Sequence, residues 1–225
     1  MNKFLYVIIA IVSLAVGALV YVKSSVLPLP EYALYYEKHR DVKPFEMTDQ
    51  NGQVFNNQSL QGKWSWIFFG YTSCPDVCPT TLQELNFSYD ALQAISPNNQ
   101  VILVSVDPSR DSQTVLSQYI NYFHPDFLAL RAGHEVLFPF ARNLGLMYAI
   151  TDGKDAAAHL AQSGESQENV VNNYLVDHSA SIVLINPQGK ITAIFKPQHK
   201  LGELPIVEGE KLISDFAKVV ALSTP

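Results

Sequence analysis

Residues 70–82 read Gly70-Tyr71-Thr72-Ser73-Cys74-Pro75-Asp76-Val77-Cys78-Pro79-Thr80-Thr81-Leu82 and contain the only two cysteines of the chain. The apolar run before them, residues 64–69, predicts a buried strand, and apolar residues at three- and four-residue steps after them predict a helix. Both sulfurs therefore lie on a strand-to-helix turn, where helix-terminal amides favour a thiolate over a thiol. In a helical segment the two side chains can turn to one face, where they could form a disulfide or hold one soft metal ion.

Length and composition narrow the class of protein. The 225 residues suit one globular domain with attachments, and an apolar content of 48% is enough for a sizeable core. The formal charge of −6 and the lack of any long basic run argue against a nucleic-acid partner. Two cysteines are too few for a scaffold held by disulfides, so the pair favours a chemical role over a single structural disulfide.

The first segment predicts a membrane anchor over residues 1–23. Residues 4–22 carry no charge, and as a helix with a rise of about 1.5 Å per residue they span roughly 28 Å, enough for the hydrocarbon core. Lys3 and Lys23 flank the run, so the orientation is weakly encoded. The alternative is a cleaved signal peptide, but the run is long for one and no clear cleavage site follows it.

The rest of the chain divides into an expected tether and one expected domain. Residues 24–43 contain prolines, scattered charges and no sustained apolar period, which indicates a tether, and residues 44–222 indicate the domain. Apolar patterns and turn signals predict a hairpin over 45–55, strands over 64–69, 101–106, 127–130, 179–185 and 190–196, and helices after the cysteines, after Asp111, over 133–146 and over 209–221. Asp111 is expected to cap its helix, residues 151–173 to form a polar surface insertion, and residues 174–180 to form a loop.

This order of elements predicts an α/β domain with a mainly parallel centre, to which the late β-hairpin adds antiparallel strands. A cysteine pair after the first central strand is the placement found in thioredoxin-like proteins. The pair then lies at the carboxyl ends of the strands, where α/β sheets bind ligands.

Spacing alone leaves metal and redox chemistry open. A redox pair usually has two residues between its cysteines, whereas this pair has three, and residues 174–180 offer His178 but no proline. Two thiolates and an imidazole form a soft set that suits copper(I), and imidazole also suits copper(II). Structural zinc would require four protein ligands. A lone histidine, however, has common structural roles as well.

Longer motifs carry a resemblance to a known family. Residues 68–79 resemble the signature of the Sco/SenC family of copper chaperones, and the similarity covers about residues 44–221. It continues through Val106-Asp107-Pro108-Ser109-Arg110-Asp111, Val176-Asp177-His178-Ser179 and Leu184-Ile185-Asn186-Pro187-Gln188-Gly189. The resemblance implies a thioredoxin-like domain with an N-terminal hairpin and a late β-hairpin, preceded by one transmembrane helix. It implies a metal site of Cys74, Cys78 and His178 for Cu(I) or Cu(II), with Cys74 and Cys78 also able to form a redox disulfide.

The resemblance also implies a function and partners. It implies delivery of copper to the binuclear copper centre of cytochrome c oxidase, with no catalytic residue. The partners would be the copper-centre subunit of the oxidase and other periplasmic copper carriers, and the domain would face the periplasm from a bacterial inner membrane. A thiol-disulfide reductase that prepares the cysteines of that centre, and a redox or copper sensor, are the alternatives.

Three further residues have more than one interpretation. Asp107 corresponds to an aspartate of the family motif, which would lie near the site and steer copper or a partner, or would merely end a strand. Asp177 is expected to be a loop residue or to support a copper ligand, without being a ligand itself. Met147 carries a soft thioether, and we expect it to pack in the core.

Overall fold

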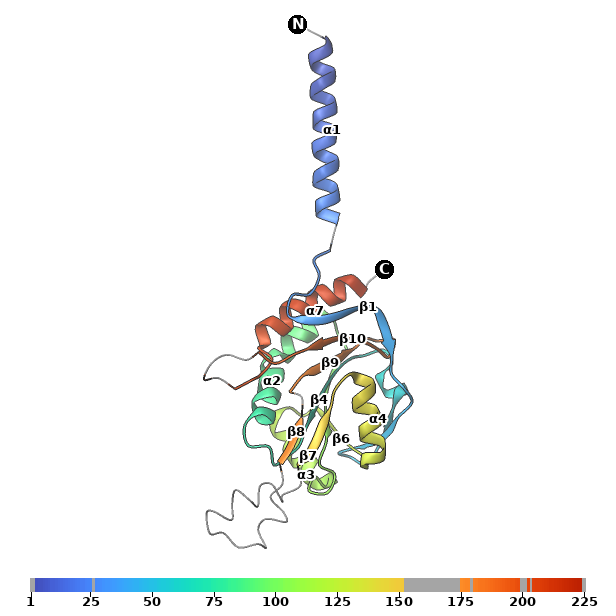
Figure 1. Cartoon of the computed structure of the whole chain (residues 1–225), viewed down its shortest axis with the longest axis vertical. Coiled ribbons are helices and arrows are strands. Elements are labelled where there is room, and N and C mark those ends of the chain that lie inside the picture. The colour runs from blue at the N-terminus through green and yellow to red at the C-terminus, as the bar shows by residue number, and fades with distance from the viewer. Residues whose placement is uncertain are drawn as a thin grey trace.

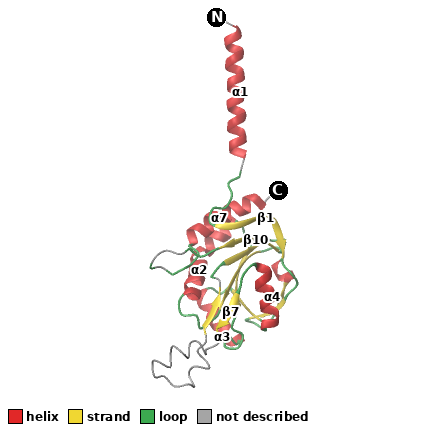
Figure 2. Cartoon of the chain, viewed as in Figure 1, coloured by secondary structure: helices red, strands yellow, loops and turns green. Residues whose placement is uncertain are grey.

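A computed structural model describes residues 3–25, 27–151, 175–178, 180–198, 202 and 204–223 of the chain (Figures 1 and 2). Its helices are α1 (Lys3–Ser25), the 3-10 helix η1 (Asn57–Leu60), α2 (Val77–Ile95), α3 (Gln113–Phe123), α4 (His134–Leu144) and α7 (Gly209–Ser223). Its strands are β1 (Ala33–Asp41), β2 (Glu46–Asp49), β3 (Val54–Asn56), β4 (Trp64–Gly70), β5 (Asn99–Ser105), β6 (Leu128–Arg131), β7 (Tyr148–Thr151), β8 (Leu175–His178), β9 (Ile182–Ile185) and β10 (Lys190–Phe195).

The described strands form one mixed sheet and one separate ribbon. The sheet has eight strands in the order β1-β10-β9-β4-β5-β6-β2-β3, and β7 pairs with β8 alone. The strands β4, β5 and β6 run parallel, while the late hairpin β9–β10 adds antiparallel strands beside β4. The predictions of an α/β domain, of the hairpin that became β2–β3 and of the late hairpin are confirmed.

Helices cover both faces of this sheet. Every residue of β4 and β5 is buried, as expected for central parallel strands covered on both sides. On one face, Phe216 of α7 packs edge-on against Trp66, with ring centroids 4.9 Å apart. On the other face, the ring centroids of Phe140 of α4 and Phe69 are 6.0 Å apart. Because Trp66 and Phe69 point to opposite sides of β4, α7 and α4 lie on opposite faces of the sheet (Figure 1).

The sheet begins earlier in the chain than we expected. The strand β1 pairs antiparallel with β10, from Ala33 opposite Phe195 to Asp41 opposite Lys190. The prediction that residues 24–43 form a tether is therefore wrong for residues 33–41. An edge strand buries only part of its surface, so β1 carries charged residues and lacks the continuous apolar run of a central strand.

A second correction concerns the segment that carries His178. Residues 174–180 were predicted to be a loop, but residues 175–178 form β8, whose partner β7 was not predicted at all. A two-stranded ribbon of four-residue strands has too few residues to show a clear alternation. The expected insertion over residues 151–173 lies outside the described residues, except for Thr151.

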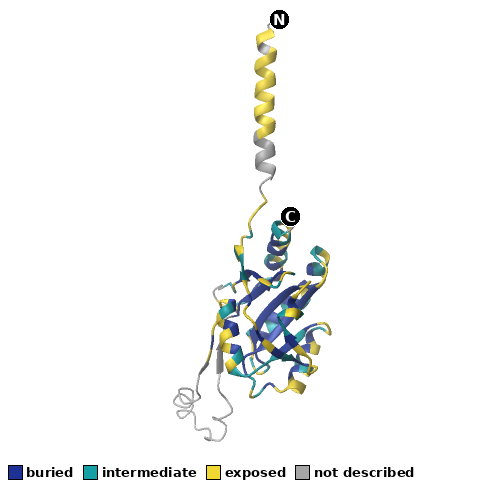
Figure 3. Ribbon diagram, turned by 90° about the vertical axis from the view of Figure 1, so that its right-hand side faces the viewer, coloured by how far each residue is buried: buried dark blue, intermediate teal, exposed yellow. Residues whose placement is uncertain are grey.

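The chain enters the domain at the end where β1 begins. The helix α1 extends from this end, and its described side chains are exposed (Figure 3). The ribbon β7–β8 lies at the other end of the domain (Figure 1). Among the helices of the described chain, none was found to combine the length and apolarity that a membrane crossing requires.

Candidate metal centre

The two cysteines lie between the end of β4 and the first turn of α2. Cys74 is half-buried in the connecting loop, and Cys78 is fully buried as the second residue of the helix. A Cβ atom on Gly70 would lie only 3.0 Å from the Cys78 sulfur and 3.0 Å from Leu103. The absence of a side chain at Gly70 therefore lets the Cys78 sulfur approach the end of the central strand.

Both cysteines are thiols that form no disulfide, and their side chains are hydrogen-bonded to each other. The pKa of the Cys78 thiol is raised far above its usual value by this bond with Cys74 and by burial. We expected helix-terminal amides to favour a thiolate, but at Cys78 burial and the neighbouring sulfur outweigh them. Two adjacent sulfurs can bind one soft ion or form a disulfide, and either event must release the Cys78 proton.

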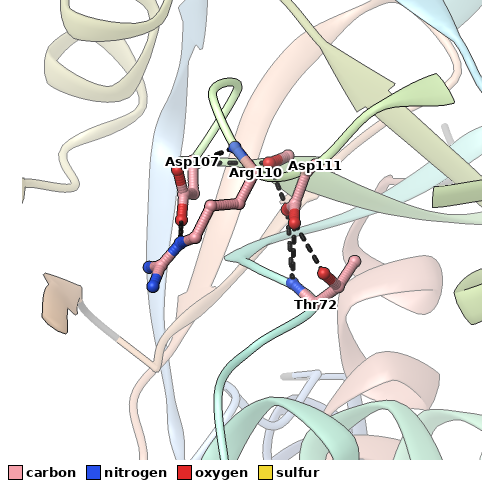
Figure 4. A network of polar contacts seen from close by, with 5 residues as sticks. Thr72, Asp107, Arg110 and Asp111 are labelled. Carbon is pink, nitrogen blue, oxygen red and sulfur yellow. Dashed lines mark hydrogen bonds and ion pairs between the residues drawn. The ribbon is translucent and has the colours of Figure 1, made fainter. Parts of the chain in front are cut away.

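A buried carboxylate fixes the start of the cysteine loop. Asp111 accepts a hydrogen bond of 2.6 Å from the Thr72 hydroxyl and another of 3.2 Å from the Thr72 backbone N–H (Figure 4). The Ser105 hydroxyl at the end of β5 donates a third bond of 2.6 Å. Burial outweighs these bonds and raises the pKa of Asp111. Asp111 thus joins the cysteine loop to the end of the neighbouring strand.

The expected capping role of Asp111 is wrong. The N-cap of α3 is Ser112, whose side chain accepts a bond of 3.3 Å from the Val115 backbone N–H. Either residue type can cap a helix, and Asp111 is one position too early, with its carboxylate turned towards Thr72.

Asp107 and the cysteine loop lie at the same end of the sheet, where the parallel strands β5 and β4 end. Asp107 is buried and forms an ion pair with Arg110 (Figure 4). The guanidinium of Arg110 lies over the Tyr71 ring at 5.6 Å from its centroid. Tyr71 in turn accepts a 3.2 Å hydrogen bond from the Cys74 backbone N–H through its carbonyl. Asp107 therefore lies in the turn after β5 and reaches the loop through Arg110 and Tyr71, and its role towards copper or a partner stays a prediction.

The backbone of His178 is held in the β7–β8 ribbon. His178 lies opposite Tyr148, and Asp177 lies opposite Ala149. The side chains of His178 and Asp177 lie outside the described residues. Among the side chains that the structure does describe, no group of three His, Cys, Asp or Glu residues could hold a metal ion. The structure thus brings Cys74 and Cys78 together and leaves the position of the third predicted ligand as a prediction.

An aromatic cluster that the sequence did not reveal holds the ribbon on α4. The Tyr148 hydroxyl and His134 Nδ1 are 2.8 Å apart, and the Tyr148 ring stacks on Phe138 with centroids 4.6 Å apart and an interplanar angle of 1°. The prediction that Met147 packs in the core is wrong, because its side chain is 82% exposed. Side chains alternate along a strand, so Tyr148 faces α4 and the preceding Met147 faces outward.

The fold and the cysteine pair together define a class. A mixed sheet with a reduced dithiol on the turn after its first central strand is that of a thioredoxin-like α/β protein. Within this class the family is shown as well, because the SCO1/SenC family model matches residues 35–206. The chain belongs to the SCO1/SenC family.

Individual relatives agree with this assignment. An SCO2-like protein of Rickettsia felis is 31% identical over 189 residues, which are 81% of this chain and 85% of that protein. A putative copper-binding protein of Stutzerimonas stutzeri is 30% identical over 172 residues, 76% of each chain. The ScoI protein of Bradyrhizobium japonicum, whose structure was solved with copper bound, is 27% identical with a TM-score of 0.59, over 80% of this chain and 99% of that chain.

Proposed function

We propose that this chain is a copper metallochaperone that binds copper through Cys74, Cys78 and His178 and delivers it to the binuclear copper centre of cytochrome c oxidase. The observation that carries the proposal is the reduced, hydrogen-bonded pair of cysteines on the β4–α2 turn. Similarity to the putative copper-binding protein of Stutzerimonas stutzeri and to the copper-bound ScoI structure supports copper as the ion.

The chemistry of these residues suits a carrier of copper. Two thiolates select copper(I), and the imidazole of His178 would extend the site to copper(II). A carrier must also release its ion. Cys74 is only half-buried, so an acceptor ligand can reach the copper from the Cys74 side while the buried Cys78 still holds it.

A thiol-disulfide reductase is the second candidate. In that reaction the thiols of Cys74 and Cys78 would become a disulfide while a disulfide in the partner becomes two thiols. The hydrogen bond between the two cysteines favours this candidate, because the sulfurs are already adjacent. A redox or copper sensor would use the same pair without delivering either copper or electrons to the oxidase.

The location in the cell is part of the proposal. Residues 1–23 would anchor the chain in a bacterial inner membrane, with the domain facing the periplasm, where the copper-centre subunit and other copper carriers would be its partners. The uncharged run of residues 4–22 supports the anchor. Recovery of a water-soluble mature chain that begins near Ser25 would instead show a cleaved signal peptide.

One substitution separates carrier from reductase. A reductase needs a thiolate pair, whereas a copper carrier of this kind also needs the imidazole. A strain with His178→Ala should lose oxidase activity at limiting copper, while the purified variant still reduces a disulfide. Cys74→Ser should lose both functions, and His124→Gln, at the end of α3, should lose neither. Normal oxidase activity in the His178→Ala strain would overturn the carrier function and favour the reductase.

A further inference from the structure

A basic hollow lies beside α4, on the face of the sheet that this helix covers. Its volume is about 440 Å³. The lining residues are Arg40, Lys43, Phe138, Pro139, Arg142 and Asn143. All three charged residues of this lining are cations, in a chain whose formal charge is −6. The hollow is therefore a local exception to the charge of the whole molecule.

Asn143 holds the side chain of Arg40 and the backbone of Lys43. The Arg40 guanidinium donates a 2.9 Å hydrogen bond to the Asn143 carbonyl and lies over the Tyr36 ring at 5.3 Å from its centroid. The Lys43 backbone N–H donates a 2.8 Å bond to Asn143 Oδ1. Within the part of the chain that the structure describes, Arg40, Lys43 and Arg142 form no ion pair. A partner carboxylate would therefore meet one guanidinium, that of Arg40, that is already positioned, and three cations that no described neighbour neutralises in an ion pair.

The hollow is linked through Phe138 to the ribbon that carries His178. Phe138 lines the hollow and is 44% exposed, and its ring stacks on Tyr148. Tyr148 lies opposite His178 in the β7–β8 pair, and Met147 next to it adds an exposed thioether. A protein bound in the hollow would thus contact the apolar ring of Phe138, which packs on the strand that pairs with the strand of His178, the proposed copper ligand.

We infer that the basic hollow is the docking surface for the protein that exchanges copper with this chain, and that this partner presents carboxylates around an apolar side chain. The inference rests on the proposed function. Opposite charges would speed the encounter and set its orientation, and Phe138 would supply the apolar contact. The contact would place the partner's copper ligands beside the β7–β8 ribbon.

The position of the hollow favours a protein partner over the bilayer surface. The chain enters the domain at Ala33, whereas Arg40 lies near the far end of β1. At about 3.3 Å per residue, these two points are on the order of 20 Å apart along the strand. This separation sets the hollow apart from the anchor, and the contact between Phe138 and Tyr148 links the hollow to the β7–β8 ribbon.

The test uses the full chain in detergent, reduced and loaded with copper(I), and the soluble copper-centre domain of the oxidase from the same organism. Arg142→Glu and Lys43→Glu change exposed residues of the hollow, and Lys63→Glu makes the same charge change at an exposed residue just before β4. We expect each hollow variant to weaken binding about tenfold at low salt, with a smaller dependence of Kd on salt and slower copper transfer. Lys63→Glu should stay within about twofold of the unmodified chain, because Lys63 does not line the hollow. Copper affinity of the isolated chain should be unchanged in all three variants.

Several outcomes would overturn the inference. Unchanged binding in Arg142→Glu, or an equal loss in Lys63→Glu, would do so while the proposed function stands. If the unmodified chain binds phosphatidylglycerol vesicles through this hollow and Arg142→Glu loses that binding, while acceptor binding is unaffected, the hollow is a membrane-binding surface instead. If the unmodified chain neither binds the acceptor domain nor transfers copper to it, the proposed function fails, and the inference fails with it.

Discussion

The Thr72 hydroxyl donates a 2.6 Å hydrogen bond to Asp111, across 39 positions of the chain. This bond joins the loop that carries Cys74 to the turn that follows β5, and Ser105 completes the set of donors around the same carboxylate. Because Asp111 is fully buried, no water replaces a lost donor without rearrangement. The geometry of the cysteine loop therefore depends on a residue outside the cysteine motif itself.

Replacing Thr72 by Val tests this dependence. Thr72→Val removes the hydroxyl and leaves a buried carboxylate short of one donor, so the free energy of unfolding should fall by about 1–3 kcal/mol. Urea unfolding measures this change, and copper titration should show weaker binding because the loop is less well fixed. Thr72→Ser keeps the hydroxyl and should recover most of the loss. Equal stability of the Val and Ser variants would show that the bond contributes nothing.

The ligand set predicts different effects on the two oxidation states of copper. The reduced chain should bind one copper ion, and His178→Ala should weaken copper(II) binding more than copper(I) binding, because imidazole suits copper(II) while thiolates dominate copper(I) affinity. Cys74→Ser and Cys78→Ser should each abolish tight binding of both. Competition titrations with absorption spectra measure these affinities. An unchanged copper(II) spectrum in His178→Ala would remove His178 from the ligand set.

A buried carboxylate on α7 holds the start of β1. Asp215 is fully buried and accepts backbone hydrogen bonds from Glu31, Tyr32 and Ala33, at 2.9, 2.5 and 2.8 Å. Asp215→Ala should lower the free energy of unfolding by about 3 kcal/mol, since it leaves several N–H groups without an acceptor. Amide hydrogen exchange should increase first in β1.

A surface substitution nearby provides the control for Asp215. Lys218 contacts both Asp215 and Glu31, and Glu31 is largely exposed. Glu31→Gln removes only the exposed ion pair and should cost less than about 1 kcal/mol. Equal losses in Glu31→Gln and Asp215→Ala would show that the ion pair, and not the buried acceptor, secures the start of β1.

His39 should make stability depend on pH on the acid side. Burial lowers the pKa of His39, and the charge of Lys190 lowers it further. The Asn186 Nδ2 atom lies 2.9 Å from His39 Nδ1. The unfolded chain therefore takes up this proton first as pH falls. The contribution of His39 is complete above its unfolded pKa of about 6.5 and is lost as pH falls through the lower folded value.

Urea unfolding between pH 7.5 and pH 5 measures this effect. The unmodified chain should lose more stability over this range than His39→Gln, which cannot bind the proton. Lys190→Gln removes one of the two causes and should reduce the difference without abolishing it. Parallel pH profiles for the unmodified chain and His39→Gln would contradict the assignment.

The sequence by itself was sufficient wherever the deciding interactions are local. The apolar run of residues 64–69 predicted β4, because a strand buried on both faces must be apolar throughout. The period of three and four residues after the cysteines predicted α2, because a helix buries one face. The placement of Cys74 and Cys78 followed from these two elements, and the surrounding motif indicated the family that residues 35–206 match.

Only the tertiary structure decided what depends on partners distant in the chain. The strand β1 is stabilised by β10, which lies about 150 positions later, so its own mixed composition could not reveal it. Asp111 and Ser112 both have side chains that can cap a helix. Ser112 is the cap in the structure, because the Asp111 carboxylate accepts hydrogen bonds from Thr72 instead. Tyr148 is buried because its ring packs on Phe138 of α4, whereas the side chain of the preceding Met147 is exposed. Local pattern reports how a segment can fold, whereas burial and side-chain partners depend on which distant segments pack against it.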